Sequence, residues 1–198
     1  MKNKIEVKVL QNYLIQSGAK LPVYGIDGDL GNETKSAIDS LNVPEYVKIA
    51  LKEVGTQEIV GKKHDKRVLE YQSTTSGKYT DDETPWCGAF ISWVMKQAKI
   101  NHFIKIPERA KEWSKFGYEV NEPTVGTIAI KSRVGGGHVC IVVGKSTNGK
   151  LLCVGGNQNN KVSISSYDKE VFQSFRNHEN TIKLSIIDSD LNSKVSEA

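Results

Sequence analysis

A change in the hydrophobic pattern near Val125 constrains this fold more than any other feature of the sequence. Before it, apolar residues recur at helical spacing in short segments, the first at 5–17. After it, turn residues separate β-rich runs at 126–130, 138–143, 151–154, 162–165 and 172–176. Helices first and consecutive strands second predict an α+β fold, in which helices pack on an antiparallel sheet.

The first half of the chain divides into several short helical segments. Thr84 and Pro85 mark the start of the most apolar one, with Thr84 as its cap and Pro85 in its first turn. Other helices are predicted at 33–41, 44–54, 66–72 and 108–115. The predicted organisation is a small helical module at 1–43 that leans on its neighbour, a main domain at 44–176 and an unassigned tail at 177–198.

Charge and hydropathy exclude several classes of protein. The net charge of +4 and the pI near 8.8 suit an anionic polymer as partner, but the basic residues form no run that would indicate nucleic acid. No segment approaches the roughly 18 apolar residues of a membrane span, so no membrane insertion is predicted. No apolar stretch follows the charged start at Met1 to Lys4, which predicts synthesis in the cytoplasm without a signal peptide.

Cys87 is the first candidate for chemistry. The chain has 3 cysteines, an odd number, so at least one thiol stays outside any disulfide. Near the start of its predicted helix, Cys87 would lie beside unpaired backbone N–H groups and the positive end of the helix dipole. Both favour the thiolate, which is the nucleophilic form. The alternative is that Cys87 is a small buried apolar side chain, as many free cysteines are.

His138 is the candidate base. It follows Gly135-Gly136-Gly137 and opens an apolar strand, so we expect it at a sheet edge that another backbone or a substrate can approach. The alternative is a histidine that merely ends a strand. His64, His102 and His178 lie in polar stretches and are interpreted as surface residues.

Asn157 is the candidate that orients the imidazole. Residues 145–150 predict a hairpin turn, in which paired residue numbers sum to either 295 or 297. In both registers His138 and Asn157 share one face of the sheet, because side chains alternate, and Gln158 points to the other face. An amide oxygen that accepts from the ring would fix its tautomer and leave the second nitrogen for the thiol proton. Nucleophile, base and orienting group together are the requirements of a cysteine hydrolase.

A zinc site is the competing interpretation of the same face. Cys140 and Cys153 alternate with His138 and could bind a metal with it and with Cys87. The usual paired-cysteine spacing is absent, and both cysteines lie within apolar strands, where core packing explains them. We therefore predict no metal and no cofactor.

Three motifs in this order resemble one known family of hydrolases. They are Asp82-Glu83-Thr84-Pro85-Trp86-Cys87-Gly88-Ala89-Phe90, Gly137-His138-Val139 and Gly155-Gly156-Asn157-Gln158. The segment from about 44 to 176 is similar to the CHAP and NlpC-type papain-like peptidoglycan hydrolases. The resemblance implies a papain-like core with Cys87 as nucleophile, His138 as base and Asn157 as third polar residue. It also implies a tyrosine near the oxyanion, for which Tyr71 and Tyr79 are candidates.

Two neighbouring features leave alternatives open. Trp86 could line the substrate cleft beside Cys87, or it could anchor the core as large aromatic residues usually do. The N-terminal segment resembles a small helical peptidoglycan-binding domain through Leu14, Gly18, Ile26-Asp27-Gly28, Leu30-Gly31 and Ala37-Ile38. The alternative is a helical pair that buttresses the main domain. Asp27 and Asp29 are explained by a turn, because the other ligands of a calcium loop are absent.

The resemblance implies a hydrolase that cleaves an amide bond of peptidoglycan, either within the stem peptide or between glycan and peptide. Without a signal peptide, such a protein would reach the periplasm or cell wall by holin-type or secretion-system-type delivery. It would be a phage lysin or an interbacterial toxin, with a possible immunity or delivery protein as partner. The alternatives are a non-catalytic wall-binding or phage-tail protein and, less directly, an acyltransferase.

Overall fold

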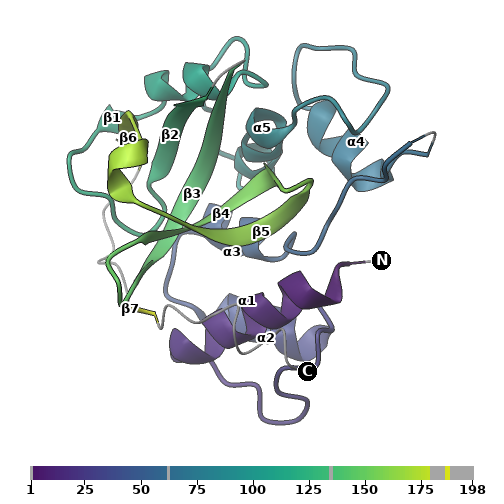
Figure 1. Cartoon of the computed structure of the whole chain (residues 1–198), viewed down its shortest axis with the longest axis vertical. Helices are drawn as coiled ribbons and strands as arrows, with labels where there is room; N and C mark the ends of the chain where they lie inside the picture. Colours follow the sequence, from purple (N-terminus) through teal and green to yellow (C-terminus); the bar gives the residue numbers. More distant parts are fainter. Residues whose placement is uncertain (1, 62, 134–135, 179–185, 188–198) are drawn as a thin grey trace.

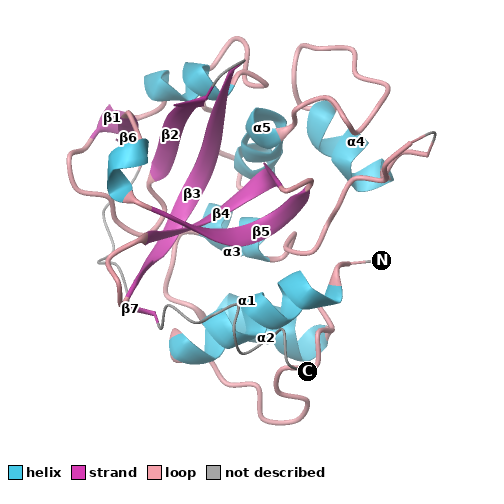
Figure 2. Ribbon diagram, in the orientation of Figure 1, coloured by secondary structure: helices cyan, strands magenta, loops and turns pink. Residues whose placement is uncertain are grey.

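The computed structural model describes residues 2–61, 63–133, 136–178 and 186–187 and has the predicted α+β architecture (Figures 1 and 2). The helices are α1 (Lys4–Gln16), α2 (Asn32–Ser40), α3 (Glu45–Leu51), α4 (Lys66–Gln72) and α5 (Cys87–Gln97), with short 3-10 helices η1 (Ala110–Lys115) and η2 (Lys169–Val171). The strands are β1 (Tyr118–Glu119), β2 (Ile128–Arg133), β3 (Gly136–Ser146), β4 (Leu151–Gln158), β5 (Lys161–Tyr167), β6 (Ser174–Asn177) and β7 (Ile186–Ile187).

One sheet organises the molecule, with strand order β1-β6-β2-β3-β4-β5 and β7 beside β3. Strands β2 to β5 follow one another as antiparallel neighbours, as the run of short β-rich segments predicted. Ile141 pairs with Val154 and Val142 with Cys153, so paired numbers sum to 295 in this part of the hairpin. The first of the two predicted registers is therefore correct there.

The hydrophobic core lies mainly between the sheet and α5. Val139 and Ile141 of β3 face the same cluster as Phe90 and Val94 of α5. Cys140, Val142 and Cys153 belong to a second, smaller cluster with Phe172 and Phe175. The alternation of β3 thus separates two layers, and both extra cysteines are core residues as predicted.

The start of α5 differs from the prediction. Trp86 is the N-cap and Cys87 the first helical residue, whereas the sequence placed Thr84 at the cap and Cys87 two positions deeper. Thr84 instead donates from its N–H and its hydroxyl to Asp81 (2.7 and 2.9 Å), which holds 81–84 as a turn. Cys87 therefore lies even closer to the end of the helix than expected.

The N-terminal helices pack directly on the rest of the chain. Tyr13 of α1 donates its hydroxyl to the backbone oxygen of Val143 in β3 (3.0 Å), and Glu6 pairs with Lys161 of β5 (3.0 Å). Apolar residues of α1 and α2 belong to the same core cluster as α3 and α5. In Figure 1 these two helices lie beneath the sheet, so the expectation that they lean on their neighbour is confirmed.

Only part of the C-terminal tail is described. Ile187 of β7 is buried, and β7 pairs in parallel with β3 at Lys145 and Ser146. The rest of the unassigned segment, at 179–185 and 188–198, lies outside the described residues, as does Gly135. Within the described part of the chain, none of the helices is long and apolar enough to cross a membrane.

Candidate active site

Cys87 stands at the positive end of α5, against the strand that carries His138. Its sulfur lies 4.0 Å from the backbone oxygen of Gly137, the residue before His138. Because Cys87 is the first residue of the helix, its own N–H has no carbonyl partner within the helix. Cys87 therefore places a nucleophilic side chain at the N-terminal end of the helix, where the helix dipole is positive.

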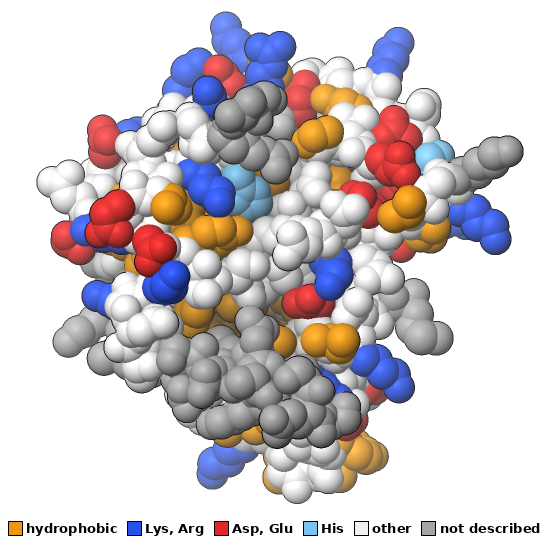
Figure 3. All heavy atoms as spheres, in the orientation of Figure 1, with side chains coloured by type: hydrophobic (Ala, Val, Ile, Leu, Met, Phe, Trp, Pro, Cys, Tyr) orange, Lys and Arg blue, Asp and Glu red, His pale blue; other side chains and the backbone are white. Residues whose placement is uncertain are grey.

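A cleft of about 410 Å³ opens beside Cys87. One wall is the segment before η1, which includes Glu108 and Arg109. This segment packs closely on α5, because a side chain at Gly88 would collide with the backbone oxygens of Pro107 and Glu108 (2.4 and 2.5 Å). Figure 3 shows Lys and Arg side chains gathered at the top of the molecule, where η1 lies in Figure 1. The cleft is lined by Pro85, Cys87, Glu108, Arg109, Ala110, Lys111, Glu112, Gly136 and Gly137. It thus offers charges of both signs to a substrate.

His138 is held by Gln158, not by Asn157. The Nε2 atom of His138 lies 3.2 Å from Oε1 of Gln158. Asn157 has a left-handed backbone (φ 54°), and the pairing of β4 with β5 shifts between Gly155 and Gln158. A bulge inserts one residue and reverses the alternation of side chains beyond it. The prediction that Gln158 points away from His138 is therefore wrong, and Gln158 replaces Asn157 as its partner.

The orientation of the Gln158 amide determines the tautomer of His138. Its Nε2 donates to the backbone oxygen of Ser163 (2.7 Å), so its Oε1 must be the atom that faces the imidazole. The hydroxyl of Tyr167 also donates to Oε1 (2.8 Å). Since a carbonyl oxygen only accepts, His138 must carry its proton on Nε2. Its Nδ1 is left as the basic nitrogen.

The surroundings of the imidazole include the Tyr167 ring and the core cysteine Cys140. The Tyr167 ring lies 6.2 Å from that of His138, and the pKa of Tyr167 is raised mainly by burial and further by the nearby cysteines, of which Cys87 has the smallest effect. Burial also raises the pKa of the Cys140 thiol well above its usual range, Cys153 adds to the shift, and His138 opposes it. A neutral thiol at Cys140 fits a packing role.

Residues 79–157 match the family model described as the CHAP domain. Over these residues the chain is similar to the CHAP domain. CHAP domains have the papain-like fold and are peptidoglycan hydrolases of amidase or peptidase type, which makes peptidoglycan the expected class of substrate. No curated protein and no solved structure matches the chain. The match begins after the N-terminal helices, so a peptidoglycan-binding module at 1–43 stays a prediction.

Two aromatic residues have structural roles: for Trp86 the structure bears out the core alternative and not the cleft role, and Tyr71 is committed to the core as well. Trp86 is completely buried and donates its indole N–H to Glu58 (3.0 Å), so it anchors the core and cannot touch a substrate. Tyr71 is also fully buried, and its hydroxyl donates to Glu53 (2.6 Å), which removes it as an oxyanion donor.

The other histidines lie apart from Cys87. His178 is exposed as expected, whereas His64 and His102 are half-buried. Nδ1 of His64 lies 3.0 Å from the buried carboxylate of Asp82, and the His102 ring packs 5.0 Å from that of Trp113. Among the residues that the structure describes, no three His, Cys, Asp or Glu side chains are grouped as metal ligands.

Gln158 and Tyr167 are the site residues that the sequence interpretation missed. The signal was the run Gly155 to Asn160, because Asn and Gly tolerate left-handed backbone and are frequent at bulges. Besides Asn157, Asn159 and Asn160 have positive φ (50° and 64°). A side chain at Gly156 would meet Trp86 and Phe90 at 2.6 Å, so β4 can approach α5 only with glycine there.

Proposed function

We propose that this protein hydrolyses an amide bond of peptidoglycan, with Cys87 as nucleophile, His138 as base and Gln158 as the residue that positions His138. The observation that carries the proposal is the fixed amide of Gln158, which leaves Nδ1 of His138 basic. The Cys87 sulfur lies beside the residue that precedes this imidazole.

The first half of the reaction is acyl transfer to sulfur. His138 Nδ1 takes the thiol proton while the sulfur of Cys87 attacks the carbonyl carbon of the substrate. The oxygen then carries negative charge, which the N–H of Cys87 and the positive end of α5 stabilise. As the C–N bond breaks, His138 returns the proton to the leaving amine, and a thioester remains on Cys87.

The second half releases the acyl group. His138 takes a proton from water, the oxygen attacks the thioester carbon, and the C–S bond breaks. The proton returns to sulfur, and the free carboxylic acid leaves. Gln158 accepts from Nε2 throughout, so the imidazolium formed in each half keeps its hydrogen bond.

The site of action follows from the substrate. Peptidoglycan lies outside the cytoplasmic membrane, so we propose action in the periplasm or cell wall, after delivery by a holin or a secretion system. The protein would then be a phage lysin or an interbacterial toxin, and a toxin would require an immunity protein in the producing cell. The need for delivery is tested by adding the purified protein to intact cells and to permeabilised cells and measuring lysis of both.

Digestion of purified peptidoglycan tests the activity. We expect new termini in the mass spectrum of the fragments with the wild type and none with Cys87→Ala. Cys140→Ser, a change at a buried thiol in the other core cluster, is the matched control and should keep the activity. The mass of the termini identifies the bond, either within the stem peptide or between glycan and peptide.

Three other outcomes contradict the proposal. Wall binding without new termini from the wild type would indicate a non-catalytic wall-binding or phage-tail protein. Fragments that carry an added acceptor instead of water would indicate an acyltransferase. Full activity of Cys87→Ala would exclude Cys87 as the nucleophile.

A further inference from the structure

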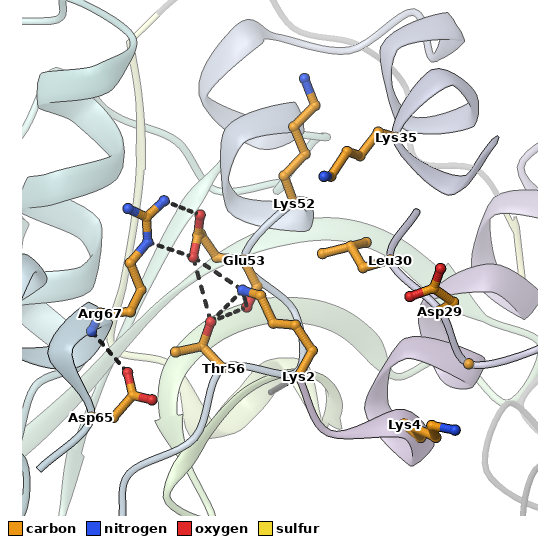
Figure 4. A pocket seen from close by; sticks show the side chains of 11 residues that line it. Lys2, Lys4, Asp29, Leu30, Lys35, Lys52, Glu53, Thr56, Asp65 and Arg67 are labelled. Atoms are coloured by element: carbon orange, nitrogen blue, oxygen red, sulfur yellow. Dashed lines mark hydrogen bonds and ion pairs between the residues drawn. The ribbon is translucent and has the colours of Figure 1, made fainter. Parts of the chain in front are cut away.

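A second cavity, of about 640 Å³, separates the N-terminal helices from α3 and α4 (Figure 4). None of the residues that line it also lines the Cys87 cleft. Its volume is within the range of small-molecule sites. The lining residues are Lys2, Lys4, Gly28, Asp29, Leu30 and Lys35 from the N-terminal segment, and Lys52, Glu53, Thr56, Asp65 and Arg67 from the main domain.

The carboxylate of Glu53 in this wall is already neutralised by protein groups. Arg67 donates to both of its oxygens (2.6 and 3.0 Å), and Lys2 lies 3.2 Å from one of them. Burial raises the pKa of Glu53, but the bonds from Arg67, Lys2 and Tyr71 outweigh it, so the net pKa is lowered and the group stays charged. Figure 4 shows this carboxylate turned toward its partners. It therefore leaves little negative charge for the cavity.

Asp65 is committed in a similar way. Its Oδ1 accepts from the N–H groups of Arg67 and Val68 (2.9 and 3.2 Å) and caps α4. Asp29 is the third carboxylate of the lining. Within the described residues, its carboxylate accepts no hydrogen bond of this kind, whereas its backbone N–H donates to Asp27. Of the three acidic side chains, only Asp29 is therefore available to offset the positive charge of the lysines in the cavity.

Lysines supply that available charge. Figure 4 shows Lys35 of α2 pointing toward Lys52 at the end of α3, above Leu30. The ion-pair partner of Lys52 is Asp39 (2.5 Å), whose side chain is 54% exposed. An exposed ion pair contributes little, so the ammonium group can exchange it for a better-placed anion. Within the described part of the chain, no ion pair is formed by Lys4 or Lys35.

We propose that this cavity binds a phosphorylated polyol or sugar, with Lys35 and Lys52 on the phosphate and Leu30 under the carbon chain. Lysine ammonium groups bind phosphate as point charges, whereas a carboxylate is best matched by the planar fork of arginine. The one arginine in the lining, Arg67, is occupied by Glu53. The proposal does not depend on the chemistry at Cys87.

The test measures binding of the full-length protein to glycerol 3-phosphate, to inorganic phosphate and to poly(glycerol phosphate). We expect the double variant Lys35→Gln/Lys52→Gln to bind the phosphorylated polyol at least about tenfold more weakly than the wild type, since two charge-assisted contacts are lost. The control is Lys105→Gln/Lys145→Gln, which removes the same charge at exposed positions outside the cavity. Urea unfolding of both variants shows whether each is folded.

Each outcome decides a part of the proposal. Binding of glycerol 3-phosphate as well as of the polymer would make free phosphorylated polyols ligands, while binding of the polymer alone would make the ligand a wall polymer. Equal weakening in the control variant would show general electrostatic attraction and overturn the site. Unchanged binding in a folded cavity variant would overturn it as well.

Discussion

Two polar networks in this protein are built on opposite principles. Around Glu53, every partner is used: Lys2, Arg67 and Tyr71 all engage the carboxylate, whose side chain is 8% exposed. Around His138, one ring nitrogen is held by Gln158 and the other is left without that bond. The first arrangement ties α3 to α4 and the N-terminus, whereas the second fixes one nitrogen of the imidazole on the strand that also contacts Cys87.

Burial of polar groups therefore stabilises the fold around Glu53, whereas around His138 it positions a side chain for chemistry. A buried charge must be compensated or it destabilises the fold, so the Glu53 network is saturated. A catalytic base must be able to take up a proton, and His138 is held through Nε2 by a neutral amide rather than by an opposite charge. Substitutions in the first should therefore change stability, and substitutions in the second should change rate.

The largest effect is expected for His138→Ala. Loss of the base should lower the rate of peptidoglycan cleavage roughly 1,000-fold or more, because the thiol proton has no acceptor. Release of soluble fragments from purified peptidoglycan measures it. His178→Ala, at an exposed histidine, is the control and should retain the wild-type rate. A similar loss in both variants would show that the rate does not report on the imidazole at position 138.

Glu53→Gln should instead affect stability. It leaves Arg67 and Lys2 without their buried counter-charge, so the free energy of unfolding should fall by about 3 kcal/mol. Urea unfolding measures it, with Glu119→Gln as control. The Glu119 side chain is 67% exposed, so its ion pair with Arg176 (3.6 Å) should contribute less than about 1 kcal/mol. If Glu53→Gln were stable but slow, the separation of the two networks would be wrong.

Gln158→Ala should lower kcat by about 10- to 100-fold, equivalent to the loss of one or two hydrogen bonds that fix the imidazole. Asn157→Gly is the matched control, because glycine keeps the left-handed backbone of the bulge and removes only the amide. Steady-state rates on the same peptidoglycan distinguish the two. A larger loss from Asn157→Gly would restore Asn157 as the orienting residue.

The smallest effect is expected in mild acid, where the stabilisation from Glu53 is lost together with that from other carboxylates of lowered pKa such as Asp82. The lowered pKa of Glu53 means that its contribution is complete above the unfolded value of 4.5 and is lost as pH falls through the folded value. The unfolding free energy should thus decrease below about pH 4.5, by at most about 1.4 kcal/mol per pH unit from this group. Glu53→Gln should flatten that dependence, while Gln158→Ala should leave it unchanged, since an amide does not titrate. Equal slopes in all three proteins would contradict the assignment.

The sequence predicted much of the fold because its local signals agreed with one another. Helices α1 and α4 begin where Asn3 and Asp65 cap them, and α4 spans the residues that the periodicity predicted. The positions of Cys87 and His138, at a helix start and a strand start, also follow from local pattern. The start of α5 was misplaced because Thr84 was taken up by Asp81 in a turn.

What the sequence by itself determined is the order of elements and the residues placed at their ends, because periodicity and capping act over a few neighbouring positions. Only the tertiary structure decided which side chain meets His138, because a single left-handed residue at Asn157 reverses the faces of the strand beyond it. It also decided that Trp86 is a core residue and that the N-terminal helices share a cavity with α3 and α4. Both depend on contacts between segments distant in sequence, which alternation along one strand or helix cannot specify.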